Sequence, residues 1–322
     1  AHYLREANKP EVQRTELNRI ELLMPKKLVD TVMNLVNANL KTLLGGKAQT
    51  SGLTMLRHVA VSNQLAGRRE FSAVHVAKAL LVDQLNTEGF TLWLHLNKEE
   101  GGLPLIKTLE AQTDASPAKY QFKHLSFQEG LFAQHLLMQA EEGWEGWAND
   151  EAAAEFLNNP FMNNTCRIGS GFLGTLLAKH RATWDFSGKS AQLNSVGLFA
   201  LWLLMENNVT LERLILKNNG VGKQHEDSAG LAKMFTTSTT LTSLDLAQNH
   251  LGALKQTTVG LRQLARGLSQ CKNLTEIDLS DNGLWPEGIR PICVALRTCS
   301  GMQRVNLSYN HPGRDLAIAD LL

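Results

Sequence analysis

The sequence predicts a multidomain protein of the α plus α/β class, in which a helical first half is followed by a solenoid of α/β repeats. Two observations support this prediction. The pattern Leu-x-x-Leu-x-Leu-x-x-Asn, with some apolar replacements, occurs four times after residue 210. Residues 1–180 lack that pattern and instead carry apolar residues at the three- and four-residue spacing of helices.

The four copies of the pattern define the repeats. They begin at Leu211, Leu241, Leu274 and Met302. In each copy the second and third apolar residues are two positions apart, so both point to the same side of a strand. An asparagine comes three positions later, where its short amide can satisfy backbone groups of neighbouring turns. These asparagines are Asn219, Asn249, Asn282 and Asn310.

An apolar helical face precedes each copy. At 13, 10 and 6 positions before the four starts stand Leu198, Leu201 and Met205; Ser228, Leu231 and Phe235; Leu261, Leu264 and Leu268; and Ile289, Ile292 and Leu296. Eleven of these twelve residues are apolar, and their spacing places them on one side of a helix. The starts lie 30, 33 and 28 residues apart. A strand and a full helix per unit indicate leucine-rich repeats of the long, ribonuclease-inhibitor-like type, which stack into a horseshoe-shaped solenoid.

The repeat region extends beyond these four copies. Trp184 and Phe186 lie 30 residues before the strand of the first clear copy, so they predict a degenerate first unit, although Lys189 stands where asparagine is expected. Apolar residues within 316–321 predict the start of a further helix after the last copy. Because the chain begins with Ala1 and stops inside this helix, we expect it to be a fragment.

The predicted domains are a helical segment over 1–50, a winged-helix-like domain over 51–125, a helical domain over 126–180 and the leucine-rich repeats over 181–322. The winged-helix-like domain is predicted from helices followed by short strands. Helices are expected over 53–65 and 74–81, with a turn at Gly67–Arg69 between them. Residues 92–96 and 120–124 then predict two strands of a hairpin-like wing.

Ser126-Phe-Gln-Glu129 is a capping box at the start of the next helix. It predicts that Ser126 caps the helix and that Glu129 returns to the backbone N–H of Ser126. Leu131, His135 and Met138 are expected to share one face of that helix.

The segment YQFKHLSFQE, Tyr120–Glu129, resembles the Phe-x-His-Leu-Ser-Phe-Gln-Glu segment of animal NLR proteins, the NACHT-type nucleotide-binding, leucine-rich-repeat receptors. In that family the segment joins a winged-helix domain to a second helical domain, and leucine-rich repeats follow. The chain departs from the family at Gly130, where an aromatic residue is usual. The resemblance implies the regulatory, ligand-sensing part of a cytoplasmic signalling ATPase, with signal transduction in innate immunity as the family's common role.

By this resemblance His124 contacts the phosphate of bound ADP. A histidine can donate a hydrogen bond to an anion, and does so more strongly when it is protonated. The alternative is a structural histidine at the junction of strand and helix, and both interpretations stay open. The resemblance also implies an intramolecular partner, an upstream nucleotide-binding domain that would carry ADP or ATP, and self-oligomerisation on activation. No cofactor is expected in this chain itself.

Composition excludes several classes of protein. A net charge of +1 and 43% hydrophobic residues argue against a disordered or nucleic-acid-binding chain. No apolar run reaches the roughly 18 residues of a membrane span. The four cysteines, Cys166, Cys271, Cys293 and Cys299, lack metal-binding spacing. Cys271, Cys293 and Cys299 lie in the predicted repeat helices or at their ends and are expected to be small buried thiols, which fits a reducing, cytoplasmic compartment.

No catalytic constellation is found, so we do not expect an enzyme. Gly188-Lys189-Ser190 looks like the end of a phosphate-binding loop, but Thr183 stands where the first glycine of a Walker A motif is required. The ten histidines form no His-Glu-x-x-His motif and no set with metal-ligand spacing.

The best candidate for a binding site is the inner, concave face of the repeats, formed by the residues that point outward from the strands. The residues that we expect to bind a partner are Glu212, Arg213, Ile215, Lys217, Asp245, Gln248, Glu276, Asp278, Asp281, Arg304, Asn306 and Tyr309. The middle strands are acidic and the flanking strands carry arginine and lysine, which suits a protein ligand with a complementary basic feature. A merely solvated polar face is the alternative.

Two functional hypotheses follow. The first is the non-catalytic, ligand-sensing part of an NLR-like ATPase that binds proteins through its repeats. The second is a stand-alone leucine-rich-repeat scaffold or inhibitor, similar to ribonuclease inhibitors or GTPase regulators.

Overall fold

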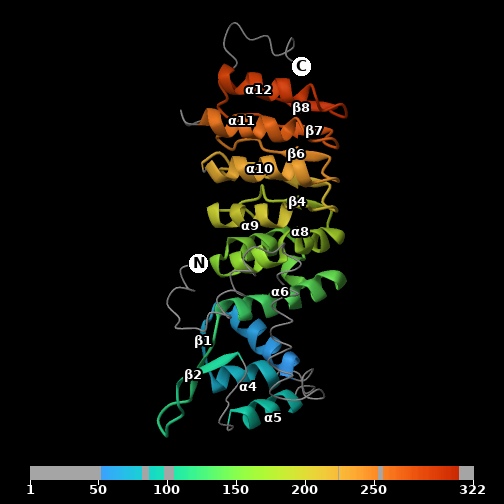
Figure 1. Cartoon of the computed structure of the whole chain (residues 1–322). Coiled ribbons are helices and arrows are strands. Elements are labelled where there is room, and N and C mark those ends of the chain that lie inside the picture. Colours follow the sequence, from blue (N-terminus) through green and yellow to red (C-terminus); the bar gives the residue numbers. More distant parts are fainter. Residues whose placement is uncertain (1–51, 82–86, 98–104, 224, 253–256, 312–322) are drawn as a thin grey trace, which may run out of the picture. The chain divides into compact units, whose positions relative to one another are not determined.

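The computed structural model describes residues 52–81, 87–97, 105–223, 225–252 and 257–311. The chain divides into two compact units, Ala1–His135 and Leu136–Leu322. Figure 1 shows a small antiparallel sheet with helices in the first unit, and helices stacked beside a series of strands in the second. The helical segment predicted over 1–50 and the helix predicted after the last repeat lie outside the described residues.

The first unit contains a helix over residues 52–65, β1 (Glu70–Ser72), α4 (Ala73–Leu81), α5 (Thr87–Leu96), β2 (Ile106–Glu110), β3 (Lys119–Phe122) and the start of α6 (Leu125–Glu142). The three strands form an antiparallel sheet in the order β1-β3-β2. Phe71, Trp93, Tyr120 and Phe122 are buried together, with the Trp93 and Tyr120 rings edge to face at 5.2 Å. The first two predicted helices and the turn at Gly67, whose φ is +62°, are confirmed.

The prediction of a strand over residues 92–96 is wrong, because these residues belong to α5. Their burial follows a helical period: Trp93 and Leu96 are buried and Leu94 between them is 46% exposed. Four of these five residues are apolar, and such a short, mostly apolar segment fits either a strand or a buried helix, because periodicity cannot separate the two at that length. The strand that precedes β3 in the chain and pairs with it is instead β2, and the last four residues of β2 are all exposed.

The second predicted wing strand is found as β3, which ends at Phe122. The predicted capping box is wrong, since α6 begins at Leu125 and Ser126 lies inside its first turn. Gln128 and Glu129 are the buried polar residues of this segment. Gln128 Nε2 donates to Gln64 Oε1 at 2.9 Å and to the Arg68 carbonyl at 3.0 Å. Leu131, His135 and Met138 lie along one face of α6, as predicted, with Leu131 buried and Met138 54% exposed.

The second unit begins with helices that precede the repeats. After the end of α6 come η2 (Glu145–Trp147), α7 (Asp150–Asn158), η3 (Pro160–Met162) and α8 (Asn163–Lys179). The side chain of Asn149 caps α7 by accepting from the Ala152 N–H at 2.8 Å. Trp147 packs edge to face on Phe156 and on Trp184, the first buried residue of the repeat sheet. α7 and α8 both pack against the first repeat helix.

Five parallel strands form the sheet of the repeats, in the order β4-β5-β6-β7-β8. They are β4 (Thr183–Asp185), β5 (Arg213–Ile215), β6 (Ser243–Asp245), β7 (Glu276–Asp278) and β8 (Arg304–Asn306). Leu214 pairs with Trp184 on one side and Leu244 on the other, and Ile277 and Val305 continue this register. Both the four predicted strands and the predicted degenerate first unit are therefore present as strands of one sheet.

Helices return between successive strands, as the spacing predicts. They are α9 (Ser195–Met205), α10 (His225–Thr237), α11 (Thr257–Leu268) and α12 (Pro286–Leu296), and each packs on the next. All eleven predicted apolar residues of the helical faces are buried, and Ser228 is partly exposed. Val221, Leu251 and Leu284 are also buried, so the core lies between the helices and the sheet.

The four asparagines form a hydrogen-bonded ladder along the repeats. The Oδ1 atom of Asn249 accepts from the backbone N–H groups of Asn219 and Val221, at 3.0 and 3.1 Å. Its Nδ2 donates to the carbonyls of Leu216 and Ala247, at 2.8 and 3.0 Å. Asn219, Asn282 and Asn310 bridge neighbouring units in the same way. The predicted structural role of these side chains is confirmed.

All four cysteines are buried and free, which confirms the small buried thiols predicted at Cys271, Cys293 and Cys299. Burial raises the pKa of each thiol, and at Cys166 it raises the value well above the ordinary range. No helix in the described part of the chain is both long enough and apolar enough to cross a bilayer.

Candidate functional site

We call the outward side of the repeat sheet the strand face: the outward side chains of β4 to β8 and of the residues that directly precede or follow each strand. All twelve residues that the sequence predicts for a binding surface lie here, and none of them is buried. The strand register sorts their strand members into two rows. The Arg213 row contains Thr183, Arg213, Ser243, Glu276 and Arg304, and the Asp245 row contains Asp185, Ile215, Asp245, Asp278 and Asn306.

The Asp245 row is held rigid by short hydrogen bonds to the chain that leaves each strand. Asp278 Oδ1 accepts from the N–H of Ser280 at 2.8 Å and from its hydroxyl at 2.6 Å. Asp185 and Asn306 make the same pair of bonds to the serine two residues later. Asp245 accepts only from the Ala247 N–H, at 2.9 Å, since an alanine takes the serine's place. The carboxylates are thus fixed in direction before any partner arrives.

Charges on the strand face are partly compensated from strand to strand. Glu276 pairs with Arg304 across β7 and β8. Asp278 Oδ2 accepts from Asn306 Nδ2 at 2.8 Å, and Asp281 Oδ2 accepts from Gln248 Nε2 at 3.2 Å. Among the residues that the structure describes, Asp245, on the central strand, has no such partner on a neighbouring strand. Its carboxylate accepts a hydrogen bond only from Ala247 of its own repeat.

The pKa of the Asp245 carboxyl is raised above its usual value. Burial among its neighbours is the largest cause, because it disfavours the charged form. The Ala247 N–H lowers the pKa, while the negative charges of Asp278 and Asp185 raise it and the cation of Lys217 lowers it. A positive group docking here would relieve the crowding of like charges, so the electrostatics favour a basic partner.

The outer part of the strand face lies where the chain turns away from each strand. Asn218, Gln248, Asp281 and Tyr309 occupy equivalent positions with φ between 51° and 60°, in the left-handed region. Tyr309 is 84% exposed, the most exposed of the large hydrophobic side chains that the structure describes. A large aromatic ring held on a fixed backbone is a typical anchor of protein interfaces.

A shallow hollow of about 400 Å³ lies beside these turns and includes two of the predicted residues, Gln248 and Asp281. Sequence reasoning missed its other members, among them Asn218, His250 and Gly283. The signal was present in the residue types, because asparagine, histidine and glycine tolerate the left-handed backbone that such turns require.

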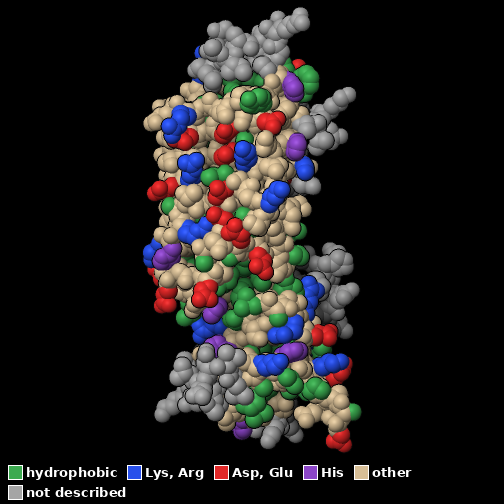
Figure 2. All heavy atoms as spheres, turned by 180° about the vertical axis from the view of Figure 1, so that it is seen from behind, with side chains coloured by type: hydrophobic (Ala, Val, Ile, Leu, Met, Phe, Trp, Pro, Cys, Tyr) green, Lys and Arg blue, Asp and Glu red, His purple; other side chains and the backbone are tan. Residues whose placement is uncertain are grey.

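Seen from behind the view of Figure 1, the face shown in Figure 2 carries acidic and basic side chains close together over the repeat half. Hydrophobic side chains are few and scattered over that part of the view. A mixed, charged surface of this kind suits specific recognition by complementary charges rather than broad hydrophobic adhesion.

His124 lies in the first unit, between the end of β3 and the start of α6, and is partly exposed. Its ring meets the Phe127 ring edge to face, with centroids 5.4 Å apart. This position fits either of the two predicted roles. Within the described ranges, no group of three histidine, cysteine, aspartate or glutamate side chains could hold a metal ion.

The leucine-rich repeat family model matches residues 237–253 and 270–293, which cover β6, β7 and their asparagines. The chain contains leucine-rich repeats. Comparison with curated proteins finds no match. The match and the parallel sheet with its returning helices agree on the repeat architecture of residues 237–293.

Proposed function

We propose that the repeats bind a partner protein through the strand face, and that the chain has no catalytic activity of its own. In this proposal the units form a curved solenoid whose inner, concave side is the strand face. The observation that carries the proposal is the row of Asp185, Asp245 and Asp278, whose carboxylates are oriented in one register along the repeat sheet. Asp245 and Asp278 lie on adjacent strands, and Ile215 stands between Asp185 and Asp245. Leucine-rich repeats bind proteins by such preformed surfaces.

The chemistry of the strand face favours a partner that presents basic groups. Asp245 and Asp278 stand directly opposite each other on adjacent parallel strands, which are typically about 4.8 Å apart. Arginine can bind such carboxylates through two parallel hydrogen bonds, and a fixed acceptor loses little entropy when it binds. Tyr309 would add an apolar anchor at the edge of the same surface.

Photo-crosslinking can locate the binding surface. A photoreactive phenylalanine analogue placed at Tyr309, on the strand face, is expected to capture the partner from cytoplasmic extract. The matched control is the same analogue at Val294, which is 54% exposed on α12 of the neighbouring repeat. Capture at position 294 and none at 309 would assign binding to the helical side and overturn the proposal.

We further propose that these repeats are the sensor arm of a cytoplasmic, NLR-like signalling ATPase. The resemblance of Tyr120–Glu129 to the NLR family supports this, as does the order of elements in the first unit, with a helix, β1, two helices and a β2–β3 hairpin before α6. The winged-helix-like domain would help to hold an upstream nucleotide-binding domain closed, with ADP near His124.

Such a protein would work as a two-state switch. A ligand on the strand face shifts the balance towards the open form only by the difference between its affinities for the two forms. Reading the coding sequence upstream of Ala1 tests this context. A Walker A motif and an acidic strand are expected within roughly one large domain, about 300 residues. Their absence would sink the NLR-like proposal and leave strand-face binding intact.

A stand-alone scaffold is the second candidate, favoured by the packing of α7 and α8 against α9 within one compact unit. Terminal capping elements of this kind are what a repeat protein needs at its ends. In this version the unit Leu136–Leu322 would bind its partner as tightly as the whole chain does.

A further inference from the structure

The outer side of α9 differs from that of the other repeat helices. The sequence of α9, SVGLFALWLLM, contains no charged residue. At the position of Phe199, counted from the start of each repeat, the following units carry Ala229, Arg262 and Arg290. At the position of Leu203 they carry Lys233, Arg266 and Val294. Large apolar side chains therefore replace basic ones on the outer side of this helix.

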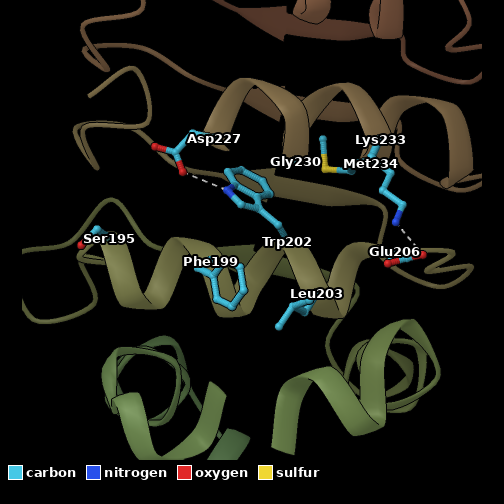
Figure 3. Close-up of a pocket in the computed structure, with 9 residues that line it drawn as sticks. All are labelled: Ser195, Phe199, Trp202, Leu203, Glu206, Asp227, Gly230, Lys233 and Met234. Atoms are coloured by element: carbon cyan, nitrogen blue, oxygen red, sulfur yellow. Dashed lines mark hydrogen bonds and ion pairs between the residues drawn. The ribbon is translucent and has the colours of Figure 1, made fainter. Parts of the chain in front are cut away.

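These apolar side chains line a cavity of about 400 Å³ between α9 and α10. Phe199 is 38% exposed, and Trp202, Leu203 and Met234 complete the apolar part of the lining. In Figure 3 the indole of Trp202 rises from α9 towards α10, and Phe199 lies lower on the same helix. A cavity of this volume holds one long side chain or a small ligand.

Trp202 is held in place from two directions. Its Nε1–H donates to Asp227 Oδ1 at 3.0 Å, and Asp227 is buried. Its ring lies against α10 at Gly230, where an added Cβ would stand 2.5 Å from the indole Cγ. Because the ring cannot shift far, the aromatic wall of the cavity is preformed.

The far end of the cavity is closed by an ion pair. Lys233 Nζ lies 2.7 Å from Glu206 Oε1, with the lysine side chain 57% exposed and the glutamate 28% exposed. Exposed pairs of this kind contribute roughly 0–1 kcal/mol, so another cation can exchange with Lys233 at little cost. The cavity thus combines aromatic rings with two carboxylates, Glu206 and Asp227, and a single cation.

Aromatic rings beside a carboxylate are the chemistry that recognises a guanidinium group. Arginine stacks on ring faces and binds carboxylates through two hydrogen bonds, whereas lysine is a point charge. The Phe199 ring already accepts one guanidinium, since Arg167 lies over it with its central carbon 5.9 Å from the ring centroid.

We propose that the cavity between α9 and α10 is a second docking site, which takes an arginine side chain from a partner protein. Its guanidinium binds Glu206 in place of Lys233, its alkyl part lies along Trp202 and Met234, and apolar neighbours in the partner's chain contact Phe199 and Leu203. The site lies on the helical side of the repeats, so it is independent of the strand face.

Titration of the ¹⁵N-labelled whole chain with acetyl-Leu-Arg-Leu-amide tests this proposal, with the Trp202 indole N–H resonance as the readout. The peptide is expected to move this resonance, and the analogue with citrulline, which has the same shape and no charge, is not. Equal shifts with both peptides, or none with the arginine peptide, would rule out an arginine site. If the site bound free arginine as tightly as the peptide, the proposal that the bound arginine belongs to a partner protein would be ruled out.

Two substitutions in the ion pair of Glu206 and Lys233 should change the affinity for the arginine peptide in opposite directions. Glu206→Gln removes the acceptor and is expected to weaken the peptide's binding about threefold or more, while Lys233→Ala removes the competing cation and strengthens it. If the pair were only structural, both substitutions would change binding in the same direction, or not at all, and the proposal would fail.

Phe199→Arg copies the residue that α11 carries at the equivalent position, Arg262. The new guanidinium occupies the site and is expected to reduce the peptide's affinity about tenfold. Arg262→Ala is the matched control and should leave the affinity unchanged. An unchanged affinity in Phe199→Arg, with a full response of the Trp202 resonance, would show that Phe199 is not part of the binding site and would contradict the proposed pose.

Discussion

At the scale of single residues, the asparagine ladder explains why this amide is required once per repeat. Asn249 accepts two backbone N–H groups and donates to two carbonyls, in a place with no access to water. A side chain must offer both functions at this length, and only asparagine does so. Each ladder residue therefore satisfies backbone groups that the turn between strand and helix leaves without partners.

Asn249→Ala is expected to cost on the order of 3 kcal/mol of unfolding free energy, because the N–H groups of Asn219 and Val221 and the carbonyl of Leu216 lose their hydrogen bonds in a buried place. The Ala247 carbonyl keeps its bond from the Asn218 N–H. Urea denaturation measures this. The matched control is Asn273→Ala, at an exposed asparagine that makes one hydrogen bond to the Thr239 carbonyl, where the loss should stay below about 1 kcal/mol. Equal losses at the two sites would contradict a structural role for the ladder.

Asp245 has the opposite effect on stability, since its pKa in the folded chain is raised. A raised pKa means that the folded state holds the proton more tightly, so stability falls as pH rises from the unfolded value through the folded one. Asp245→Asn removes this loss. The same asparagine is tolerated at the equivalent Asn306, which keeps the bond to the residue two positions later.

Thermal unfolding should therefore show a higher midpoint for Asp245→Asn than for the natural chain at pH 7, and equal midpoints below about pH 3.5. A stabilising substitution at a charged surface residue is typical of binding sites, where function costs stability. If Asp245→Asn lowered the midpoint at pH 7, the carboxylate would be a structural residue instead.

At the scale of elements, the repeat strands and helices could be predicted because their periods recur. Leu214, Leu244 and Ile277 stand in register because each copy places its apolar residues two apart. In the first unit no repetition helped: α5 contains a short, mostly apolar segment, residues 92–96, that also fits a strand, and the last four residues of β2 are all exposed, without alternation. Elements defined by tertiary packing alone leave no periodic signal.

The binding surface was predictable to a similar degree. Outward positions of a strand follow from the period of two, so all twelve strand-face residues could be named. The ion pair and hydrogen bonds that compensate their charges depend on register between repeats and could not be named. The sequence of α9 shows that this helix has no charged residue. The cavity beside it could not be predicted from that, because residues of α10 form the other part of its lining.

Close contact between α8 and α9 depends on glycines. A Cβ on Gly171 would stand 1.5 Å from the carbonyl oxygen of Glu206, just after the break in α8 at Ser170. We expect Gly171→Ala to force the helices apart and to cost more than about 3 kcal/mol. Urea denaturation compares it with Gly188→Ala, where an added Cβ meets nothing within 4 Å. Similar midpoints for both variants would refute this packing.

At the scale of the whole molecule, the helices before the repeats belong to the same compact unit as the repeats. Our predicted boundary at residue 180 would cut between α8 and β4, and would uncover the apolar α9. The ends of the winged-helix-like domain at residue 125 and of the helical domain at residue 180 stay predictions.

Two fragments test whether the repeats need the preceding helices as a cap. Residues 136–322 are expected to unfold cooperatively and to bind little of a hydrophobic dye, whereas residues 181–322 should bind the dye strongly, because α9 loses the cover of α7 and α8. Calorimetry and dye fluorescence measure both properties. Cooperative unfolding of 181–322 at the same midpoint would show that the preceding helices are not needed as a cap.

The most direct test of strand-face binding is the affinity of the partner captured at position 309 for the whole chain. Asp245→Asn with Asp278→Asn keeps both acceptors and removes two charges. This pair is expected to weaken binding about tenfold or more and to reduce its dependence on salt. Glu155→Gln with Glu287→Gln, at exposed helix positions, removes the same charge and should change affinity less than about twofold. Equal affinities for the two variant pairs would contradict strand-face recognition.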